Sequence, residues 1–298
     1  LRLVLLAELV EEKGMSDVIA GPIWAARNWS ADEGAGSIHD DDTANELGFR
    51  GGTVAGDVHM NQFPPVLIKA LGQQWFERGN LSLSFKNATV DRERVQAFAE
   101  VSAEDEKTAR VWMTRDDGLL VATGSATLGN HAESELRKKD YRSGEPSELR
   151  ILNRVEPGVS LGTYQGMTDP KKQFQRYDAG LISDPLPWFR TDSPWGGPVA
   201  APCTVIEFLW GYAMIGLKPL IGEGVGLFGA IEIGFDQGPL MMNAHYRLES
   251  RVICVGQSPQ TEYVWYETEA FDQQDRRVAM MLMQSRVMKA SSALYPDL

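Results

Sequence analysis

Cysteine is scarce in this sequence of 298 residues, where Cys203 and Cys254 are the only two. Two cysteines cannot form the disulfide framework of small secreted domains, so nothing in the sequence points to an oxidising compartment. Positive charge is also scarce, because 29 lysines and arginines stand against 41 acidic residues and leave a net charge of −12. This balance disfavours nucleic acid and anionic membranes as general partners, although a local basic pocket remains compatible with it.

The sequence also has few long hydrophobic runs. The apolar start, Leu1 to Val10, lacks a cationic leader and a small-residue cleavage site, and it runs directly into Glu11 and Glu12. We therefore expect neither a signal peptide nor a membrane-spanning helix, and we interpret residues 1–14 as an amphipathic helix or a non-native extension. The expected location is the cytoplasm.

What the sequence does contain is a repeat. Gly51-Gly52-Thr53-Val54-Ala55 returns 145 residues later as Gly196-Gly197-Pro198-Val199-Ala200. Each copy precedes a stretch with helical spacing of apolar residues, and the first of these is interrupted by Pro64-Pro65. Segments with the alternation of half-buried strands follow each helix, at 81–85, 95–101, 111–114 and 119–128 and again at 244–252, 264–270 and 278–288. The repeated order of elements favours an internal duplication.

The duplication predicts a domain organisation. Residues 15–130 form the first unit, the polar and charged residues 131–150 form a linker, and residues 151–298 form the second unit. One helix against an antiparallel meander, twice, predicts an α+β protein. Because each sheet alone has open edges, we expect the two sheets to join edge to edge with a pseudo-twofold relation.

A family resemblance rests on motifs in the first unit. Ser37-Ile38-His39-Asp40, the run Ala44 to Gly51, and Val54-Ala55-Gly56 resemble the MaoC-like dehydratase and (R)-specific enoyl-CoA hydratase family. The resemblance implies a tandem (double) hot-dog fold, in which each antiparallel sheet wraps around a central helix. It also implies that the protein adds or removes water at a 2-enoyl or 3-hydroxyacyl thioester, with coenzyme A as part of the substrate and no cofactor. A small-molecule acyl thioester is then the partner, and a homodimer of double hot-dogs is an assembly open to test.

The family pairs an aspartate with a histidine, and here the pair is split. His39 matches the motif histidine, and Gly56 matches the glycine whose amide faces the thioester oxygen, but Gly34 stands in the place of the aspartate. Asp32 and Glu33 are near but out of register. In the second half, Asp184 keeps the aspartate while Phe189 replaces the histidine. A site assembled from His39 and Asp184, and a degenerate one, both remain open.

Substrate-binding candidates surround the first motif: Arg50, Gly51, Gly52, Val54, Asp57 and His59. Asp57 suits a helix N-cap equally well, and His59 could simply cover the helix start. Arg50 belongs to a group of basic residues that coenzyme A could use, unless they are ordinary solvated surface residues. The others are Lys69, Arg78, Lys86, Arg92 and Arg94.

Other chemistry has weaker support. Asp40-Asp41-Asp42 lacks the spacing of a metal site, so no metal is expected. Cys203, at the start of the second helix, is interpreted as a core residue rather than a nucleophile. Two other functions remain alternatives: a hot-dog acyl-CoA thioesterase with Glu207 or Asp57 as its base, and a non-catalytic acyl-ligand-binding protein.

Overall fold

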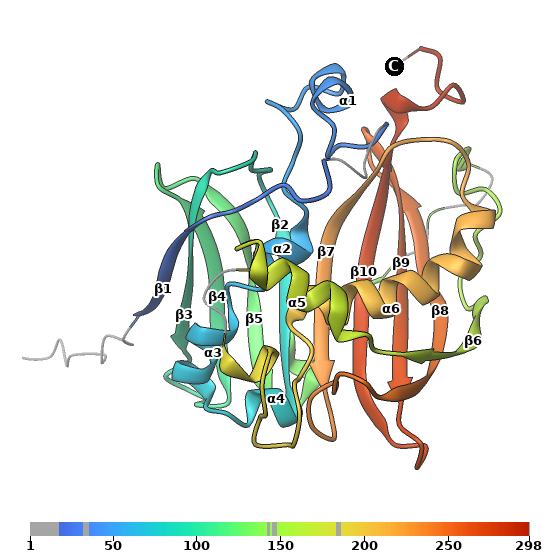
Figure 1. Cartoon of the computed structure of the whole chain (residues 1–298). Helices are drawn as coiled ribbons and strands as arrows, with labels where there is room; N and C mark the ends of the chain where they lie inside the picture. Colours follow the sequence, from blue (N-terminus) through green and yellow to red (C-terminus); the bar gives the residue numbers. More distant parts are fainter. Residues whose placement is uncertain (1–17, 32–35, 142–143, 145–147, 183–185, 298) are drawn as a thin grey trace, which may run out of the picture.

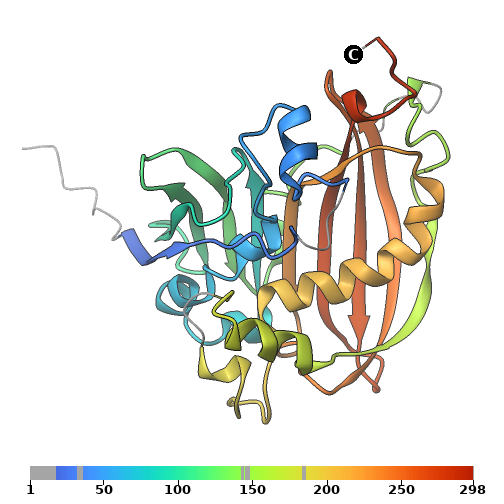
Figure 2. The ribbon, with the colours of Figure 1, turned by 45° about the horizontal axis from the view of Figure 1, so that its top comes forward.

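In the computed structural model of the chain, one antiparallel sheet runs through the whole molecule. The structure describes residues 18–31, 36–141, 144, 148–182 and 186–297. Within them the sheet has ten strands in the order β1-β3-β4-β5-β2-β7-β10-β9-β8-β6. Helices lie along one face of this curved sheet, with α3 against the first five strands and α6 against the last five (Figures 1 and 2).

The bounds of the elements are as follows. The strands are β1 (Val18–Ala25), β2 (Gly79–Phe85), β3 (Arg94–Val101), β4 (Thr108–Arg115), β5 (Leu120–Leu128), β6 (Ser160–Met167), β7 (Gly226–Phe235), β8 (His245–Gln257), β9 (Thr261–Phe271) and β10 (Arg277–Met288). The helices are α1 (Asp41–Glu46), α2 (Gly56–Met60), α3 (Pro64–Leu71), α4 (Trp75–Arg78), α5 (Pro170–Asp178) and α6 (Pro202–Leu217).

The two halves join at the centre of the sheet, as expected. Each half contributes five strands, and β2 pairs with β7 in antiparallel register from Asn80–Gly234 to Ser84–Ala230. The order of strands on one side of this junction mirrors the order on the other side. The junction thus leaves neither central strand as an open edge.

The central helices differ between the halves. Pro64 and Pro65 interrupt the first one, because proline cannot donate the backbone hydrogen bond that would continue α2 into α3. Gly72 ends α3 with a φ of 78°, a conformation that favours glycine. In the second half α6 runs unbroken for 16 residues and is followed by a 3-10 turn at Lys218–Leu220.

Backbone pairing corrects the offset of the repeat. An isolated bridge joins Thr53 to Val90 in the first half, and its counterpart joins Val199 to Met241 in the second. Thr53 therefore corresponds to Val199 rather than to Pro198, one position beyond the offset of 145 read from the glycines. By this relation Ile38 corresponds to Trp188, since their carbonyls accept hydrogen bonds from Thr53 and Val199.

Three strands have no counterpart among the expected elements. The edge strands β1 and β6 contain glycine, and β1 also contains proline, which obscures the alternation of a strand. The glycines at the start of β7 looked like the end of the preceding helix, yet β7 is the strand that joins the halves. No helix among the described residues has the length and apolar character needed to cross a membrane.

The described part of the linker packs on the outer face of the sheet. Leu136 is buried there against Ala230, Trp265 and Leu282. The buried apolar residues next to these three along their strands point to the opposite face of the sheet, into the main core. Arg137 donates to Glu232 of β7 at 2.8 Å and to Glu267 of β9 at 2.6 Å. The connection between the halves is therefore also a strap that holds the second sheet.

Candidate functional site

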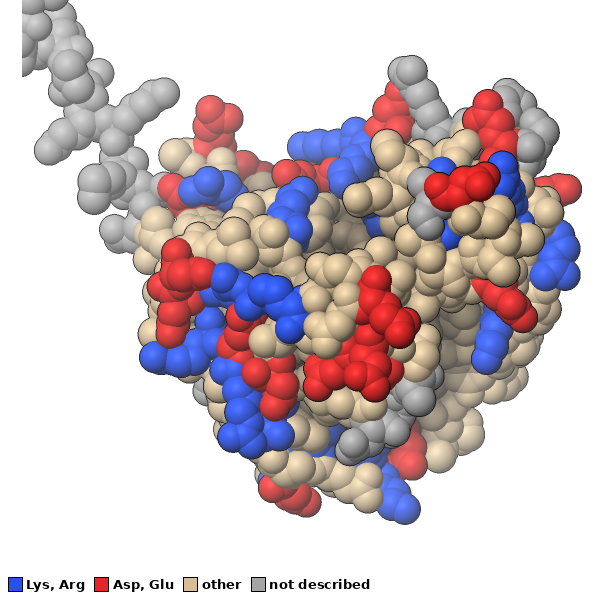
Figure 3. All heavy atoms as spheres, turned by 90° about the horizontal axis from the view of Figure 1, so that it is seen from above, with Lys and Arg blue, Asp and Glu red and all other residues tan. Residues whose placement is uncertain are grey.

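A cavity of about 1000 Å³ opens where the central strands diverge. The pairing of β2 with β7 ends at Ser84 and Ala230, so the residues beyond these two positions separate and line the space between the halves. The view from above shows a hollow near the middle of this face, with Lys and Arg beside it (Figure 3). Residues from α2, α6, β2, β7, β10 and the 36–55 segment all contribute to the lining.

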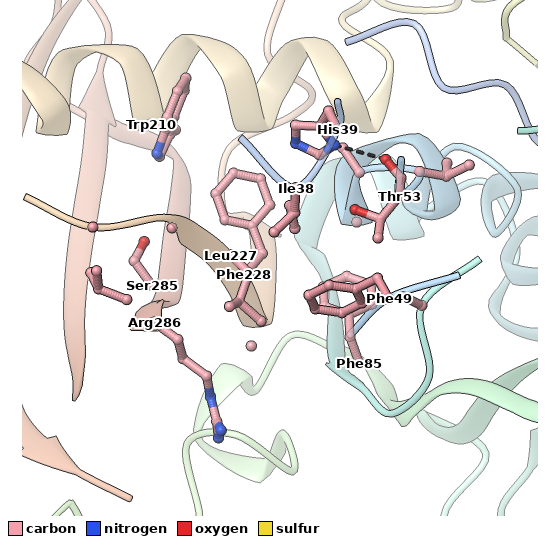
Figure 4. Close-up of a pocket in the computed structure, with 18 of the residues that line it drawn as sticks. Ile38, His39, Phe49, Thr53, Phe85, Trp210, Leu227, Phe228, Ser285 and Arg286 are labelled. Atoms are coloured by element: carbon pink, nitrogen blue, oxygen red, sulfur yellow. Dashed lines mark hydrogen bonds between the residues drawn. The ribbon is translucent and has the colours of Figure 1, made fainter. Parts of the chain in front are cut away.

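His39 lies on the wall of this cavity. Its Nδ1 is 2.7 Å from the carbonyl oxygen of Thr53 (Figure 4). A carbonyl can only accept, so Nδ1 carries a proton, and in the neutral ring Nε2 keeps its lone pair. Asn28 fixes the backbone by donating from Nδ2 to the carbonyl of His39 at 2.8 Å. The arrangement leaves Nε2 available as a base.

Gly56 also lines the cavity, as the first residue of α2. Its N–H belongs to the first turn, which has no acceptor within the helix. A Cβ at this position would lie 2.5 Å from the ring of Phe85, another lining residue, so only glycine fits against that ring. The Phe85 ring thus packs directly against Gly56, and both residues form this part of the wall.

Two polar side chains of the wall are buried without partners. Thr53 Oγ1 and His59 Nδ1 have no hydrogen-bond partner among the described residues, and Thr53 and His59 are each 2% exposed. His59 Nε2 is paired with Thr89 Oγ1 at 2.8 Å, and burial lowers the pKa of His59 to about 4, so its ring is neutral at neutral pH. Sequence reasoning passed over Thr53, because nothing in its spacing marks it.

Some of the remaining binding candidates line the cavity and others do not. Val54 and His59 line the cavity, whereas Arg50, Gly51, Gly52 and Asp57 do not. Arg50 pairs with Glu93 at 2.7 Å. The amide of Gly52 donates to Asp41 Oδ1 at 2.6 Å, and a Cβ at Gly52 would lie 2.3 Å from the carbonyl oxygen of His39. The glycine pair therefore supports the His39 backbone rather than a ligand.

Similar folds occur among solved structures, although no protein-family model and no curated protein match the sequence. A Chloroflexus aurantiacus protein named provisionally as a MaoC domain dehydratase is 9% identical, with a TM-score of 0.59 over 92% of this chain and 95% of that chain. A Mycobacterium tuberculosis protein described as a double hot-dog is 12% identical, with a TM-score of 0.59 over 92% and 96%. This chain has the double hot-dog fold. A structure named a MaoC-like dehydratase is also similar, at 12% identity and a TM-score of 0.53 over 92% and 98%.

In this double hot-dog two of the acids that follow His39, Asp40 and Asp41, accept hydrogen bonds from the local backbone. Asp40 caps α1 by accepting from the Thr43 backbone N–H at 3.3 Å, and it also accepts from the Thr43 hydroxyl at 2.8 Å; these hydrogen bonds lower the pKa of its carboxyl. Asp41 accepts from Gly52, as above. Asp184 lies outside the described residues, as do Asp32 and Glu33. Among the described residues, no group of three or more His, Cys, Asp or Glu is arranged to hold a metal ion.

Asp57 and Glu207 lie together at the interface of α2 with α6, away from the cavity lining of the double hot-dog. Burial, followed by the nearby Glu207, raises the pKa of Asp57 to about 7. Glu207 forms an ion pair with Arg176 of α5, whose Nη1 is 2.9 Å from Oε2. Cys203 is buried beside them, and burial raises the pKa of its thiol to about 12. The two candidate thioesterase bases thus belong to one charged cluster, in which Asp57 is buried and Glu207 is half-buried.

Proposed function

We propose that the cavity binds an acyl thioester and that His39 adds water to, or removes it from, a 2-enoyl or 3-hydroxyacyl thioester. The observation that carries this proposal is the hydrogen bond from His39 Nδ1 to Thr53, which leaves the Nε2 lone pair for a substrate or a water. The likeness to MaoC-like dehydratase structures supports the fold that the reaction would use.

Hydration needs a base for water, a donor for the thioester oxygen and an acid for the α-carbon. In the proposed reaction Nε2 takes a proton from water while the water oxygen bonds to the β-carbon. The electrons of the double bond move toward the thioester oxygen, which accepts a hydrogen bond from the Gly56 amide. The imidazolium then returns its proton to the α-carbon. One histidine thus handles both proton transfers, and dehydration follows the reverse path.

The motif aspartate that would help to orient the water is replaced by Gly34. Among the described lining residues the only acid is Glu223, an exposed residue of the loop before β7. Thr53 Oγ1 is buried in the wall without a partner, and its backbone carbonyl already holds His39. We assign Thr53 the role of holding the imidazole through its carbonyl, and His39 Nε2 orients the water itself, because the Thr53 hydroxyl is shielded from solvent.

The test is hydration of a short 2-enoyl-CoA, followed by the loss of ultraviolet absorbance of the conjugated thioester. His39→Ala is expected to lower kcat by at least about 100-fold, the range of a lost acid–base group. His245→Ala is the matched control, since His245 is an exposed residue at the start of β8 and should leave kcat unchanged.

Three results contradict the proposal. Equal turnover by wild type and His39→Ala would remove His39 from the reaction. Release of free thiol from a saturated acyl-CoA, lost in Asp57→Asn or Glu207→Gln, would favour the thioesterase instead. Saturable binding of acyl-CoA with no turnover would favour a non-catalytic acyl-binding protein.

A further inference from the structure

The charge of the cavity is opposite to that of the protein. The chain as a whole carries −12, yet the ionised side chains of the lining are Lys86, Lys218 and Arg286 against the single acid Glu223. A cavity with an excess of cations and apolar walls concentrates anionic ligands. This local sign therefore points to a ligand with negative charge.

Arg286 is the most constrained of these cations. It lies on β10, half-buried, and its Nε donates to Gln284 Oε1 at 3.0 Å. No carboxylate of the described residues lies within 4.0 Å of it, whereas Arg50, Arg92 and Arg94 on the surface pair with acids. Burial lowers the pKa of the Arg286 guanidinium, as expected for a cation partly removed from water. A buried cation of this kind is stabilised by an anionic partner.

The backbone is shaped to hold this arginine. β7 and β10 lose register between Gln284 and Ser285, where Gly229 of β7 is the unpaired residue of a bulge. A Cβ at Gly229 would lie 2.3 Å from Gln284 Oε1 and 2.6 Å from Arg286 Nε. Glycine at this position leaves the space that the Arg286 and Gln284 side chains occupy.

Further cations gather around Arg286 from the first half and from the linker. Burial, then Lys86, and more weakly Arg286 lower the pKa of Lys139, whose Nζ lies 3.3 Å from Ser84 Oγ, while Glu135 acts in the opposite direction. Lys86 and Arg286 also line the same cavity, and like charges gathered in one region raise the free energy unless an anion lies between them. Lys86 follows β2 and Arg286 is on β10, so an anion between them would touch both halves.

The cationic end is separated from His39 by an apolar stretch. Figure 4 shows His39 and Arg286 at opposite ends of the pocket, with the side chains of Leu227, Phe228, Phe49 and Phe85 between them. A ligand that reaches both ends has a reactive thioester at one end, an apolar middle and an anionic group at the other.

We propose that Arg286 and Lys86 form an anion-binding site for a carboxylate or phosphate group of the thioester substrate, at the end of the cavity remote from His39. This proposal rests on the proposed function for the thioester, but the anion site itself is tested by binding alone. A carboxylate would come from the far end of the acyl chain, and a phosphate from coenzyme A.

The experiment is equilibrium binding by calorimetry, with three probes and no turnover. Free coenzyme A carries phosphates, succinyl-pantetheine carries a carboxylate without phosphates, and butyryl-pantetheine carries neither. Arg286→Ala and Lys86→Ala are expected to weaken one of the two anionic probes by at least about tenfold, the effect of a lost charged hydrogen bond. Loss for coenzyme A identifies a phosphate, and loss for succinyl-pantetheine identifies a carboxylate.

The controls separate this site from the reaction. Butyryl-pantetheine should bind both variants as it binds wild type, and Arg94→Ala, which removes an exposed paired arginine, should bind every probe as wild type does. Lys86 is exposed, so Lys86→Ala keeps the test valid if Arg286→Ala does not fold. Unchanged binding of both anionic probes, equal weakening of all three, or no binding of either anionic probe to wild type would overturn the anion site. If the two variants lose affinity for an anionic probe but the wild-type protein does not hydrate enoyl-CoA, only the proposed function is overturned.

Discussion

The two halves of the sheet place different residues at corresponding points. His39 in the first half lines an open cavity, whereas Phe189, its counterpart by backbone pairing, is 1% exposed in a cluster of aromatic rings. Phe76 and Tyr177 lie around Phe189 with ring centroids at 6.1 and 6.2 Å, and Gln173 donates to its carbonyl. At this position the first half borders an open cavity, whereas in the second half aromatic rings fill the corresponding space.

The central helices of the two halves differ in the same way. In the first half α2 is short and ends before Pro64, so Gly56 presents its backbone to the cavity at the start of the helix. In the second half α6 is long, and its residues Trp210 and Met214 serve as a wall of the same cavity. The comparison teaches that the second half contributes walls and two cations, Lys218 and Arg286, to a cavity whose lining histidines come from the first half.

The largest effect is expected from removing the buried Phe189 ring of the second half. Phe189→Ala is expected to lower the free energy of unfolding by about 3–5 kcal/mol, because it leaves a large void among packed rings. Urea unfolding measures the loss. Phe49→Ala, a half-buried ring on the cavity wall, should cost under about 1.5 kcal/mol while weakening acyl-thioester binding. Equal costs for the two variants would contradict the contrast between the halves.

A smaller effect should appear in the pH dependence of stability, at the interface of α2 and α6. The pKa of Asp57 is raised to about 7, so its protonated form favours folding below the ordinary value and this contribution is lost as the pH rises to about 7. Between pH 5 and 8 the wild-type free energy of unfolding should fall by about 2–3 kcal/mol through this group, at about 1.4 kcal/mol per unit.

Asp57→Asn is the matched control for that slope, because the amide keeps the shape of the side chain and does not titrate. Denaturant unfolding at several pH values should show a flatter profile in the variant than in wild type. Parallel profiles would mean that the Asp57 carboxyl ionises normally beside Glu207, Arg176 and Cys203.

The smallest effect concerns the support of His39. Gly52→Ala would bring a Cβ to 2.3 Å from the His39 carbonyl, so the backbone must shift and carry the imidazole with it. We expect kcat of the proposed hydration to fall by about tenfold, since small displacements of a catalytic group are costly. Gly211→Ala is a useful control in initial-rate assays, because it also borders the cavity but its Cβ would meet no atom within 4 Å. Wild-type kcat in Gly52→Ala would show that the glycine is dispensable.

Much of the fold could be predicted from the sequence, because the relevant patterns are local. Alternation gave the strands of both meanders, Pro64-Pro65 gave the break in the first helix, and the repeat gave the junction of two sheets. His39 and Gly56 came from a motif, and both line the same cavity. These features depend on neighbours along the chain, which a sequence displays directly.

The rest depends on contacts across the chain. Arg286 and Lys86 are 200 residues apart in the sequence, and both line one cavity because β2 and β7 diverge at the end of their pairing. Asp57 looked like a helix cap or a ligand residue, and only the packing of α6 against α2, with Arg176 of α5 paired to Glu207, places it beside these two charges. The offset of the repeat was wrong by one position because matching glycines in a turn do not fix the register of the bridges that follow.

The strap across the outer face has a consequence for dividing the molecule. Glu232 is fully buried and accepts hydrogen bonds from Ser134 and Arg137, both of which precede the second set of strands in the chain. A fragment beginning at residue 151 would therefore lose the cation paired with Glu232 and the cover over the apolar residues Trp265 and Leu282 of the outer face. We expect such a piece to be insoluble when expressed alone, whereas one that starts at Gly129 would carry its own counter-ion.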